Sequence, residues 1–190
     1  MIDSTDITKF DRNEIELQEY FLFCVCIAGK TSTIQAKKLE QFLEPAWFKK
    51  LTPFEYIDYL IEENLLREMV CNARLGQYNR LTEIFKRCTK LDLETATLEE
   101  MESIPGIGPK TSRCFVLHSR PRQKIAVLDT HILGWLRDNT TGITIPTSTP
   151  QSTSRYGMIE QLFLKEAKKR RMSPERFDLK IWNQRARLTA

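Results

Sequence analysis

Long apolar runs are missing from this sequence, and their absence limits where the protein can act. The longest run, YFLFCVCIAG at 20–29, is far shorter than the roughly 20 residues that a membrane-spanning helix needs. The N-terminal stretch MIDSTDITKFDRNE is acidic and polar, unlike a secretory signal. We therefore expect an intracellular protein, in the cytoplasm or nucleoid, or in the nucleus of a eukaryotic cell, with no membrane partner.

Metal-binding side chains are few and dispersed. The chain has two histidines and five cysteines, and the cysteines are Cys24, Cys26, Cys71, Cys88 and Cys114. Cys24 and Cys26 stand two apart in an apolar helical segment, so they point to different faces and make a poor chelate. With no other close pair, the sequence predicts buried free thiols and neither a zinc nor an iron–sulfur site.

Charge and composition indicate a folded protein with a weak preference for polyanions. The 190 residues carry a net charge of +4, with 41% hydrophobic and 28% charged residues. This length suits one large domain or two small lobes. The basic balance is compatible with nucleic acid but does not require it.

No segment alternates at period two, so we predict an all-α protein of roughly eight to ten helices. The second helix, from Ser32, is expected to end before Pro45. Thr52, Thr97 and Asp129 are expected to be N-caps. Helices are expected over about 13–28, 32–43, 54–65, 75–88, from 97 to Gly106, 110–119, 129–140, 155–172 and 175–186. A Thr-, Ser- and Pro-rich loop spans 139–154.

Glycine is scarce, yet two of the seven glycines stand two apart in SIPGIGPK, residues 103–110. A turn this short between two helices requires backbone conformations that glycine supplies at little cost. Pro109 suits the first position of the second helix. The amides of the turn then point outward beside the positive end of the helix dipole, an arrangement that holds a phosphate without reading a base. A plain helical corner is the alternative.

The string IPGIGPKTS, with LEEME before it and RCFVL after it, resembles the helix-hairpin-helix element of the base-excision DNA glycosylases, the superfamily of endonuclease III. VLDTHI resembles that family's Val-Asp-Thr-His string, and its Asp129 follows Lys110 by nineteen positions. FCVCIAGKTS, LGQYNRLTEIF and FDLKIWN resemble other family segments, the last of them in the 8-oxoguanine branch. The resemblance implies a two-lobed helical glycosylase fold over 1–190, with a hairpin at 98–119 and lobes of 30–120 and of 1–29 plus 121–190.

The resemblance assigns Lys110 as nucleophile and Asp129 as its electrostatic partner. Cleavage of an N-glycosidic bond builds positive charge on the sugar, which a fixed carboxylate stabilises. A lysine attacks only as the neutral amine, and the first turn of a helix and partial desolvation both favour loss of its proton. Lys110 as a solvated lysine or phosphate contact, and Asp129 as a helix cap alone, are the alternatives.

Further residues are expected to contact DNA or the flipped base. Lys30 is a candidate plug for the gap that base flipping leaves, although relatives more commonly carry glutamine or asparagine there. The expected DNA contacts are Gly106, Ile107, Gly108, Thr111, Lys30, Arg113, Arg122 and His131. The expected base-pocket residues are Phe23, Asp178 and Trp182. For the aromatic residues the alternative is a place in the core.

The resemblance implies a monomeric bifunctional DNA glycosylase and abasic-site lyase that acts on duplex DNA without a cofactor. No cysteine follows Cys114, so the iron–sulfur loop of endonuclease III is absent; a monovalent cation on hairpin carbonyls is compatible with the family. The expected substrate is an oxidised purine such as 8-oxoguanine, although the tail QRARLTA lacks the lysine of many short relatives. The alternatives are an oxidised pyrimidine or modified base, a lyase only, and a non-catalytic DNA-binding module.

Overall fold

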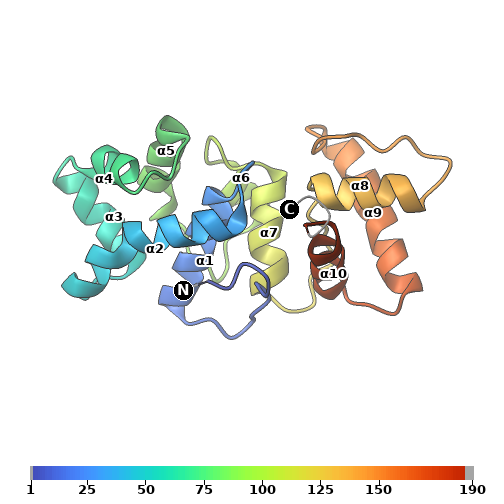
Figure 1. Ribbon diagram of the computed structural model, residues 1–190, viewed down its shortest axis with the longest axis horizontal. Helices are drawn as coiled ribbons and strands as arrows, with labels where there is room; N and C mark the ends of the chain where they lie inside the picture. The colour runs from blue at the N-terminus through green and yellow to red at the C-terminus, as the bar shows by residue number, and fades with distance from the viewer. Residues whose placement is uncertain (1, 187–190) are drawn as a thin grey trace. The chain divides into compact units, whose positions relative to one another are not determined.

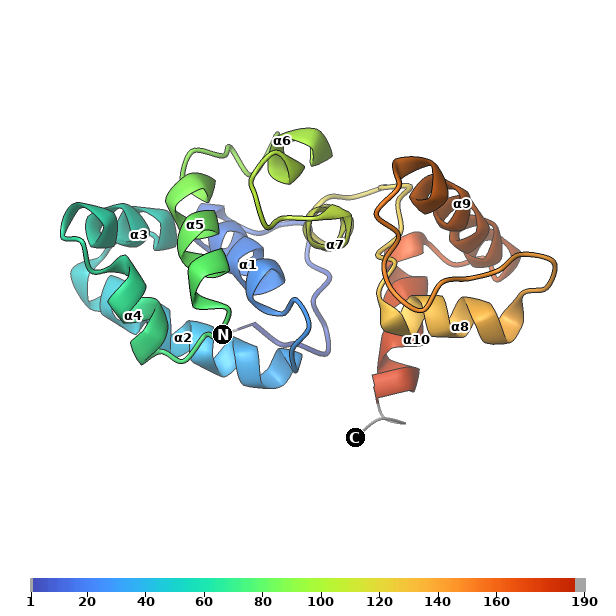
Figure 2. The same cartoon turned by 90° about the horizontal axis from the view of Figure 1, so that it is seen from above.

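The computed structural model describes residues 2–186, and over these residues it has ten α-helices and no strand. The all-α prediction is thereby confirmed (Figures 1 and 2). The helices are α1 (Glu14–Cys26), α2 (Ser32–Lys49), α3 (Pro53–Glu62), α4 (Leu66–Asn72), α5 (Tyr78–Cys88), α6 (Leu98–Glu102), α7 (Pro109–Ser119), α8 (Thr130–Asn139), α9 (Thr153–Lys169) and α10 (Pro174–Ala186).

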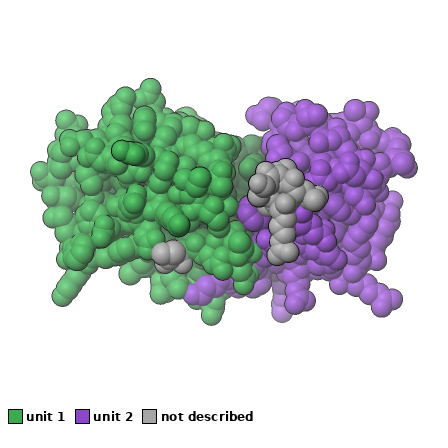
Figure 3. All heavy atoms as spheres, viewed as in Figure 1, with its two compact units in different colours: residues 1–7, 11–115 green, residues 8–10, 116–190 purple. Residues whose placement is uncertain are grey.

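The described residues fall into two compact units (Figure 3). Residues 2–7 and 11–115 form unit 1, residues 8–10 and 116–186 form unit 2, and the boundary falls within α7. This division differs from the lobes expected from the sequence, because α1 lies in unit 1 rather than with the C-terminal segment. The reason is burial: every side chain from Tyr20 to Cys26 contributes to the core of unit 1.

The core of unit 1 is built on aromatic side chains around α1. Phe21 of α1 meets Phe115 of α7 edge to face, with ring centroids 5.2 Å apart. Phe42 of α2 packs against Phe85 of α5 at 5.5 Å. All four rings are at most 1% exposed, and burial of each such ring contributes about 1.5–3 kcal/mol. This packing fixes α7, which begins at the hairpin.

The core of unit 2 joins α8, α9 and α10. Phe163 of α9 lies 5.1 Å from Phe177 of α10, and Trp135 of α8 meets Phe177 edge to face at 5.0 Å. The segment before α8 belongs to the same core through Ala126 and Leu128, which are fully buried. The residues leading to Asp129 are therefore part of the packed interior.

The expected helix starts are confirmed at three positions. Thr52 and Thr97 each form a capping box with the glutamate three residues on. Asp129 caps α8, since its side chain accepts a hydrogen bond from the amide of Ile132. Pro53 and Pro109 stand at the first positions of α3 and α7, where the missing N–H has no acceptor in any case.

One helix continues beyond its expected end, and another was not expected from the sequence. α2 does not end before Pro45 but continues to Lys49, because Phe42, Leu43 and Ala46 keep one apolar face buried on both sides of the proline. The segment 66–72 forms the unpredicted helix α4, whose buried Leu66 and Val70 stand four residues apart. Tertiary burial outweighs local preference in both cases. None of the helices in the described part of the chain is long and apolar enough to cross a bilayer.

Candidate active site

The hairpin between α6 and α7 is shaped by one glycine and one proline. α6 ends at Glu102, four residues earlier than expected, because Pro105 disfavours helical backbone at the residue before it. Gly106 has φ +98°, and a Cβ there would lie 3.1 Å from side-chain carbons of both Arg80 and Ile84. Gly108 has no positive φ, and a Cβ there would meet no atom within 4 Å. Of these two glycines, only Gly106 is required by the backbone conformation and the packing of the turn.

The turn leaves several amides without an acceptor. The amide of Ile107 donates to the carbonyl of Ile104, and that of Thr111 to the carbonyl of Gly108. The amides of Gly106, Gly108 and Lys110 form no hydrogen bond with any residue that the structure describes. Ile107, 4% exposed, anchors the turn in the core with its side chain. Open amides beside a helix N-terminus form a site for an anion.

Lys110 and Thr111 occupy the first turn of α7. Lys110 is half-buried, and its ammonium forms no hydrogen bond or ion pair with any residue in 2–186. Thr111 is 7% exposed, so its side chain faces the interior. The first turn thus presents one lysine amine that is not engaged elsewhere.

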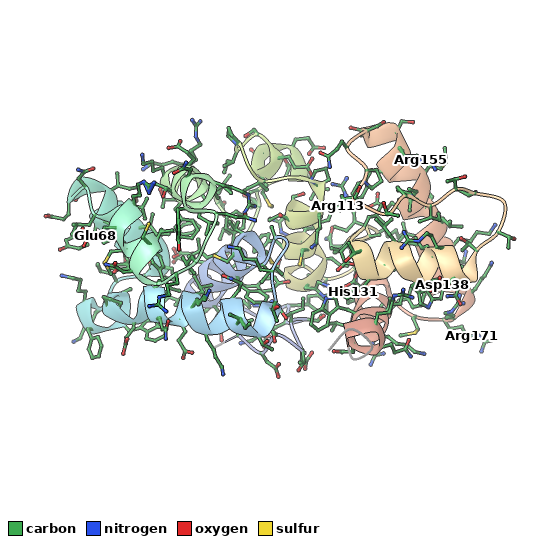
Figure 4. The ribbon with its side chains drawn as sticks, turned by 45° about the horizontal axis from the view of Figure 1, so that its top comes forward. Glu68, Arg113, His131, Asp138, Arg155 and Arg171 are labelled. Atoms are coloured by element: carbon green, nitrogen blue, oxygen red, sulfur yellow. The ribbon has the colours of Figure 1, made fainter. Side chains whose placement is uncertain are left out.

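Glu102 joins the two helices of the hairpin. Its carboxylate accepts hydrogen bonds from the Ser112 hydroxyl at 2.6 Å and from the Arg113 guanidinium at 2.9 Å. Arg113, labelled in Figure 4, also donates to the carbonyl of Pro109 at 3.4 Å. Arg113 was expected to contact DNA, and in this structure its guanidinium pairs with Glu102 across the hairpin. Sequence analysis missed Glu102, whose only sequence signal is a position one turn before Pro105.

Asp129 lies in unit 2 with one carboxylate oxygen in use. Its Oδ1 accepts the Ile132 amide at 2.8 Å, and the residue is 8% exposed. Its Oδ2 forms no hydrogen bond with a residue of the described chain. This hydrogen bond caps the N-terminus of α8. The cap therefore fixes the side chain while one oxygen stays available.

The extended segment before Asp129 is tied to α9 and to the long loop. Tyr156 accepts from the Leu128 amide at 3.2 Å and donates to the Ala126 carbonyl at 2.7 Å. Glu160 accepts from the Ala126 amide at 2.9 Å, and Thr149 donates to the Leu128 carbonyl at 2.8 Å. Sequence analysis missed these three residues, because nothing local marks a hydroxyl or carboxylate as the partner of a distant backbone.

Of the remaining expected residues in unit 2, His131 and Trp182 lie together. Their rings meet edge to face with centroids 6.0 Å apart, and both are half-buried (His131 is labelled in Figure 4). Arg122 is exposed, with φ 61°. His131 stands two positions after Asp129, and its ring and that of Trp182 offer a surface on which a base can stack.

Two of the three expected base-pocket residues are engaged inside the protein. Asp178, 6% exposed, pairs with the imidazole of His118 at 3.2 Å, and the other ring nitrogen of His118 lies 2.7 Å from the Thr8 hydroxyl. Phe23 is 1% exposed and packs beside Tyr20 in unit 1. Of the three, Trp182 is the residue that retains exposed surface.

Lys30 follows α1 in unit 1, and its ammonium donates to the carbonyl of Leu75. Burial lowers the pKa of Lys30, and the positive charges of Lys38 and Arg80 lower it further. The side chain lies across Gly76, where a Cβ would approach its nitrogen to 2.8 Å. In this structure Lys30 links the end of α1 to the loop before α5.

No cluster of three or more metal-ligating side chains occurs within residues 2–186. The carbonyl of Gly106 faces the guanidinium of Arg80 at 3.0 Å, so it does not fit a monovalent cation. Four cysteines are buried and Cys71 is half-buried, all of them free thiols, as predicted. Burial raises the pKa of Cys26 to about 12, which makes it a poor nucleophile at neutral pH.

The described residues form two helical units, and a glycine-bearing hairpin joins α6 to α7. Among solved structures, the chain is similar to the crystal structure of Methanocaldococcus jannaschii 8-oxoguanine glycosylase/lyase in complex with a 15mer DNA containing 8-oxoguanine. The TM-score is 0.66 at 20% identity, over 93% of this chain and 83% of that one. This similarity shows the fold. No family model and no curated protein matches the sequence.

Proposed function

We propose that this protein is a bifunctional DNA glycosylase and abasic-site lyase that acts on duplex DNA containing a damaged base. The observation that carries the proposal is the hairpin turn, which combines three amides without acceptors and an unengaged lysine in the first turn of α7. The capped carboxylate of Asp129 at the spacing of the family motif supports it. The similar structure is a glycosylase/lyase with DNA, which is a third line of support.

In the proposed mechanism the hairpin amides bind a backbone phosphate of the damaged strand. The neutral amine of Lys110 forms a bond to C1′ of the sugar as the bond from C1′ to the base breaks, and the base leaves with a proton. Asp129 stabilises the positive charge that develops on the sugar. The ring then opens to a Schiff base, loss of the 2′ proton follows, and the bond from C3′ to its oxygen breaks.

The substrate that we propose is an oxidised purine such as 8-oxoguanine. The support is the FDLKIWN segment, whose Trp182 keeps exposed surface beside His131, together with the neighbouring structure that contains 8-oxoguanine. Stacking of a base on an aromatic ring contributes about 1–3 kcal/mol.

A second candidate is a lyase that acts only on abasic sites made by other enzymes. The burial of Phe23 and the pairing of Asp178 with His118 favour it, because they leave fewer side chains to recognise a base. Lys110 and Asp129 keep their roles in this case. The two candidates differ in whether an intact damaged base is released.

The test is borohydride trapping with duplexes that contain 8-oxoguanine, thymine glycol, uracil or an abasic site. We expect a covalent adduct with 8-oxoguanine and with the abasic site, and none with Lys110→Gln. The exposed Lys90→Gln is the matched control and should trap like the wild type. An adduct with the abasic site alone would leave only the lyase, and binding without any adduct would leave a DNA-binding module.

A further inference from the structure

Arg80 of α5 makes contacts that no sequence motif assigns. Its Nε donates to the carbonyl of Gly106 at 3.0 Å, and its Nη1 donates to the carbonyl of Val25 at 3.2 Å. The same Nη1 donates to the side-chain oxygen of Gln77 at 2.8 Å. One guanidinium therefore joins the hairpin turn, the end of α1 and the start of α5, all within unit 1.

The contact with Gly106 restrains the peptide unit that shapes the turn. The carbonyl of Gly106 accepts from Arg80, and the N–H on the same peptide, that of Ile107, donates to Ile104 at 3.0 Å. With both ends of this peptide bonded, its plane is fixed. The neighbouring amides of Gly106 and Gly108 are the ones left open. The orientation of the open donors thus depends on a bond that Arg80 supplies.

Gln77 extends the same connection. Its Nε2 donates to the carbonyl of Ala28 at 3.2 Å while its Oε1 accepts from Arg80, and its backbone is left-handed, with φ 47°. The two side chains together bind two carbonyls at the end of α1 and one in the hairpin. The position of the hairpin relative to the end of α1 is therefore set by Arg80 of α5 and by Gln77, the N-cap residue of that helix.

The charge of Arg80 is not neutralised by the protein. Its three acceptors are neutral, and it forms no ion pair with any residue in the described range 2–186. The guanidinium lies half-buried next to the turn, where it raises the positive potential that an anion meets. Three of its five N–H donors, those of Nε and Nη1, already bind oxygens within unit 1, so its contacts with the turn do not depend on a bound anion.

We infer that Arg80 is a positioning residue for the hairpin: it orients the open amides of the turn toward a phosphate without contacting the phosphate itself. The inference rests on the proposed function for the identity of the phosphate as DNA. The claim about the turn itself concerns the free protein and stands on the contacts above.

The test of the turn is amide hydrogen exchange on the free protein, with Arg80→Met, Arg80→Lys and the control Arg87→Met, which alters an exposed arginine of the same helix. We expect exchange of the Ile107 amide to accelerate by about tenfold in Arg80→Met, since one clamp of that peptide is lost. In Arg80→Lys the exchange rate of the Ile107 amide should lie between those of the wild type and Arg80→Met. In Arg87→Met it should match the wild type. Unchanged exchange at Ile107 in Arg80→Lys and Arg80→Met would overturn the inference.

A second readout separates positioning from direct contact. Affinity for an abasic-site duplex should fall in Arg80→Met while the slope of log affinity against log salt stays the same, because no phosphate contact is lost. A slope smaller in magnitude by about 0.9 would identify Arg80 as a phosphate ligand and overturn the inference. If Arg80→Met does not fold, Arg80→Lys decides both readouts. If the wild type binds no DNA, the proposed function fails and hydrogen exchange still decides the role of Arg80.

Discussion

The hairpin of unit 1 and the segment before α8 in unit 2 differ in what they leave unbonded. At the hairpin, three backbone donors lack acceptors and a lysine amine is unengaged. In unit 2, Ala126 and Leu128 have both N–H and C=O bonded, and a single carboxylate oxygen of Asp129 is left over. One region offers donors and the other offers an acceptor. Such regions suit an anion and a developing positive charge, respectively.

The way each region is held also differs. The hairpin turn is fixed by charged side chains, Glu102 and Arg80, that bond across it. The segment before α8 is fixed chiefly by the buried hydroxyl of Tyr156, which bonds to two of its peptides. The hairpin is therefore more sensitive to changes of charge, and the carboxylate segment to changes in packing and hydrogen bonding.

The largest effect is expected from substitutions of Asp129, because they can separate its role as helix cap from its role as a negative charge. Asp129→Asn keeps a good N-cap, so stability should stay within about 0.5 kcal/mol of the wild type. The rate of base release should fall by about 10²–10³-fold, because the negative charge is lost. Asp129→Ala should also lose about 1 kcal/mol of stability. Single-turnover kinetics measure the rate of base release, and urea unfolding measures the stability. A fully active Asp129→Asn would contradict the electrostatic role of Asp129.

Substitutions at the two glycines of the hairpin should have different effects, one on stability and the other on DNA binding. Gly106→Ala should lower stability by about 1–3 kcal/mol, because of the positive φ and the close approach to Arg80 and Ile84. Gly108→Asp should leave stability within about 0.5 kcal/mol, since its Cβ meets open space. It should weaken binding to an abasic-site duplex by at least about tenfold through repulsion of the phosphate. Thermal unfolding measures the stability of both variants, and fluorescence anisotropy measures their binding to the duplex. Unimpaired binding by Gly108→Asp would show that the turn does not bind the phosphate.

Tyr156→Phe tests how the carboxylate segment is held. Loss of the hydroxyl leaves the carbonyl of Ala126 and the amide of Leu128 without that partner, at a cost of about 1–3 kcal/mol. Base release should slow because Asp129 directly follows the loosened segment. The exposed Tyr78→Phe is the matched control and should change neither stability nor rate. Equal stability of the two variants by urea unfolding would count against a scaffold role for Tyr156.

The smallest effect is expected at Glu166 of α9, a buried carboxylate in the scaffold of unit 2. The hydrogen bond from Lys169, followed by that from Arg170, lowers the pKa of Glu166. A carboxyl with a lowered folded pKa stabilises the protein above its unfolded pKa, and this stability is lost as the pH falls through the folded value. Glu166→Gln should cost about 1 kcal/mol at pH 7, since both partners are partly exposed.

The difference between Glu166→Gln and the wild type should disappear in acid, once the pH has fallen through the lowered folded pKa of Glu166. Urea unfolding at the two pH values measures it. Glu83→Gln, which alters an exposed pair with Lys86 at 3.5 Å, should have no effect at either pH. A difference for Glu166→Gln that persists unchanged in acid would show that packing, and not the ion pairs, stabilises this site.

The parts predicted from sequence are those encoded locally. The caps at Thr52, Thr97 and Asp129 and the helix start at Pro109 depend on residues within one turn of each other, so their patterns are visible in the chain. The positive φ at Gly106 follows from the shortness of its turn. The continuation of α2 past Pro45 and the helix α4 were not predicted, because the burial of Ala46 and Val70 depends on other helices.

The supports of the candidate site were not predictable for a related reason. Arg80 bonds to Gly106, twenty-six positions away, and Tyr156 to Ala126, thirty positions away. Such pairings join separate helices and leave no local signature. Arg113 shows the converse, since its charge predicts a phosphate contact while the fold pairs it with Glu102.

The most direct test of the account is to identify the residue that carries the sugar after borohydride reduction. The wild-type protein would be trapped on an abasic-site duplex, digested with nuclease and protease, and analysed by mass spectrometry. The account predicts the sugar remnant on Lys110, in the first turn of α7. A remnant on Lys30 or on any other amine would contradict it.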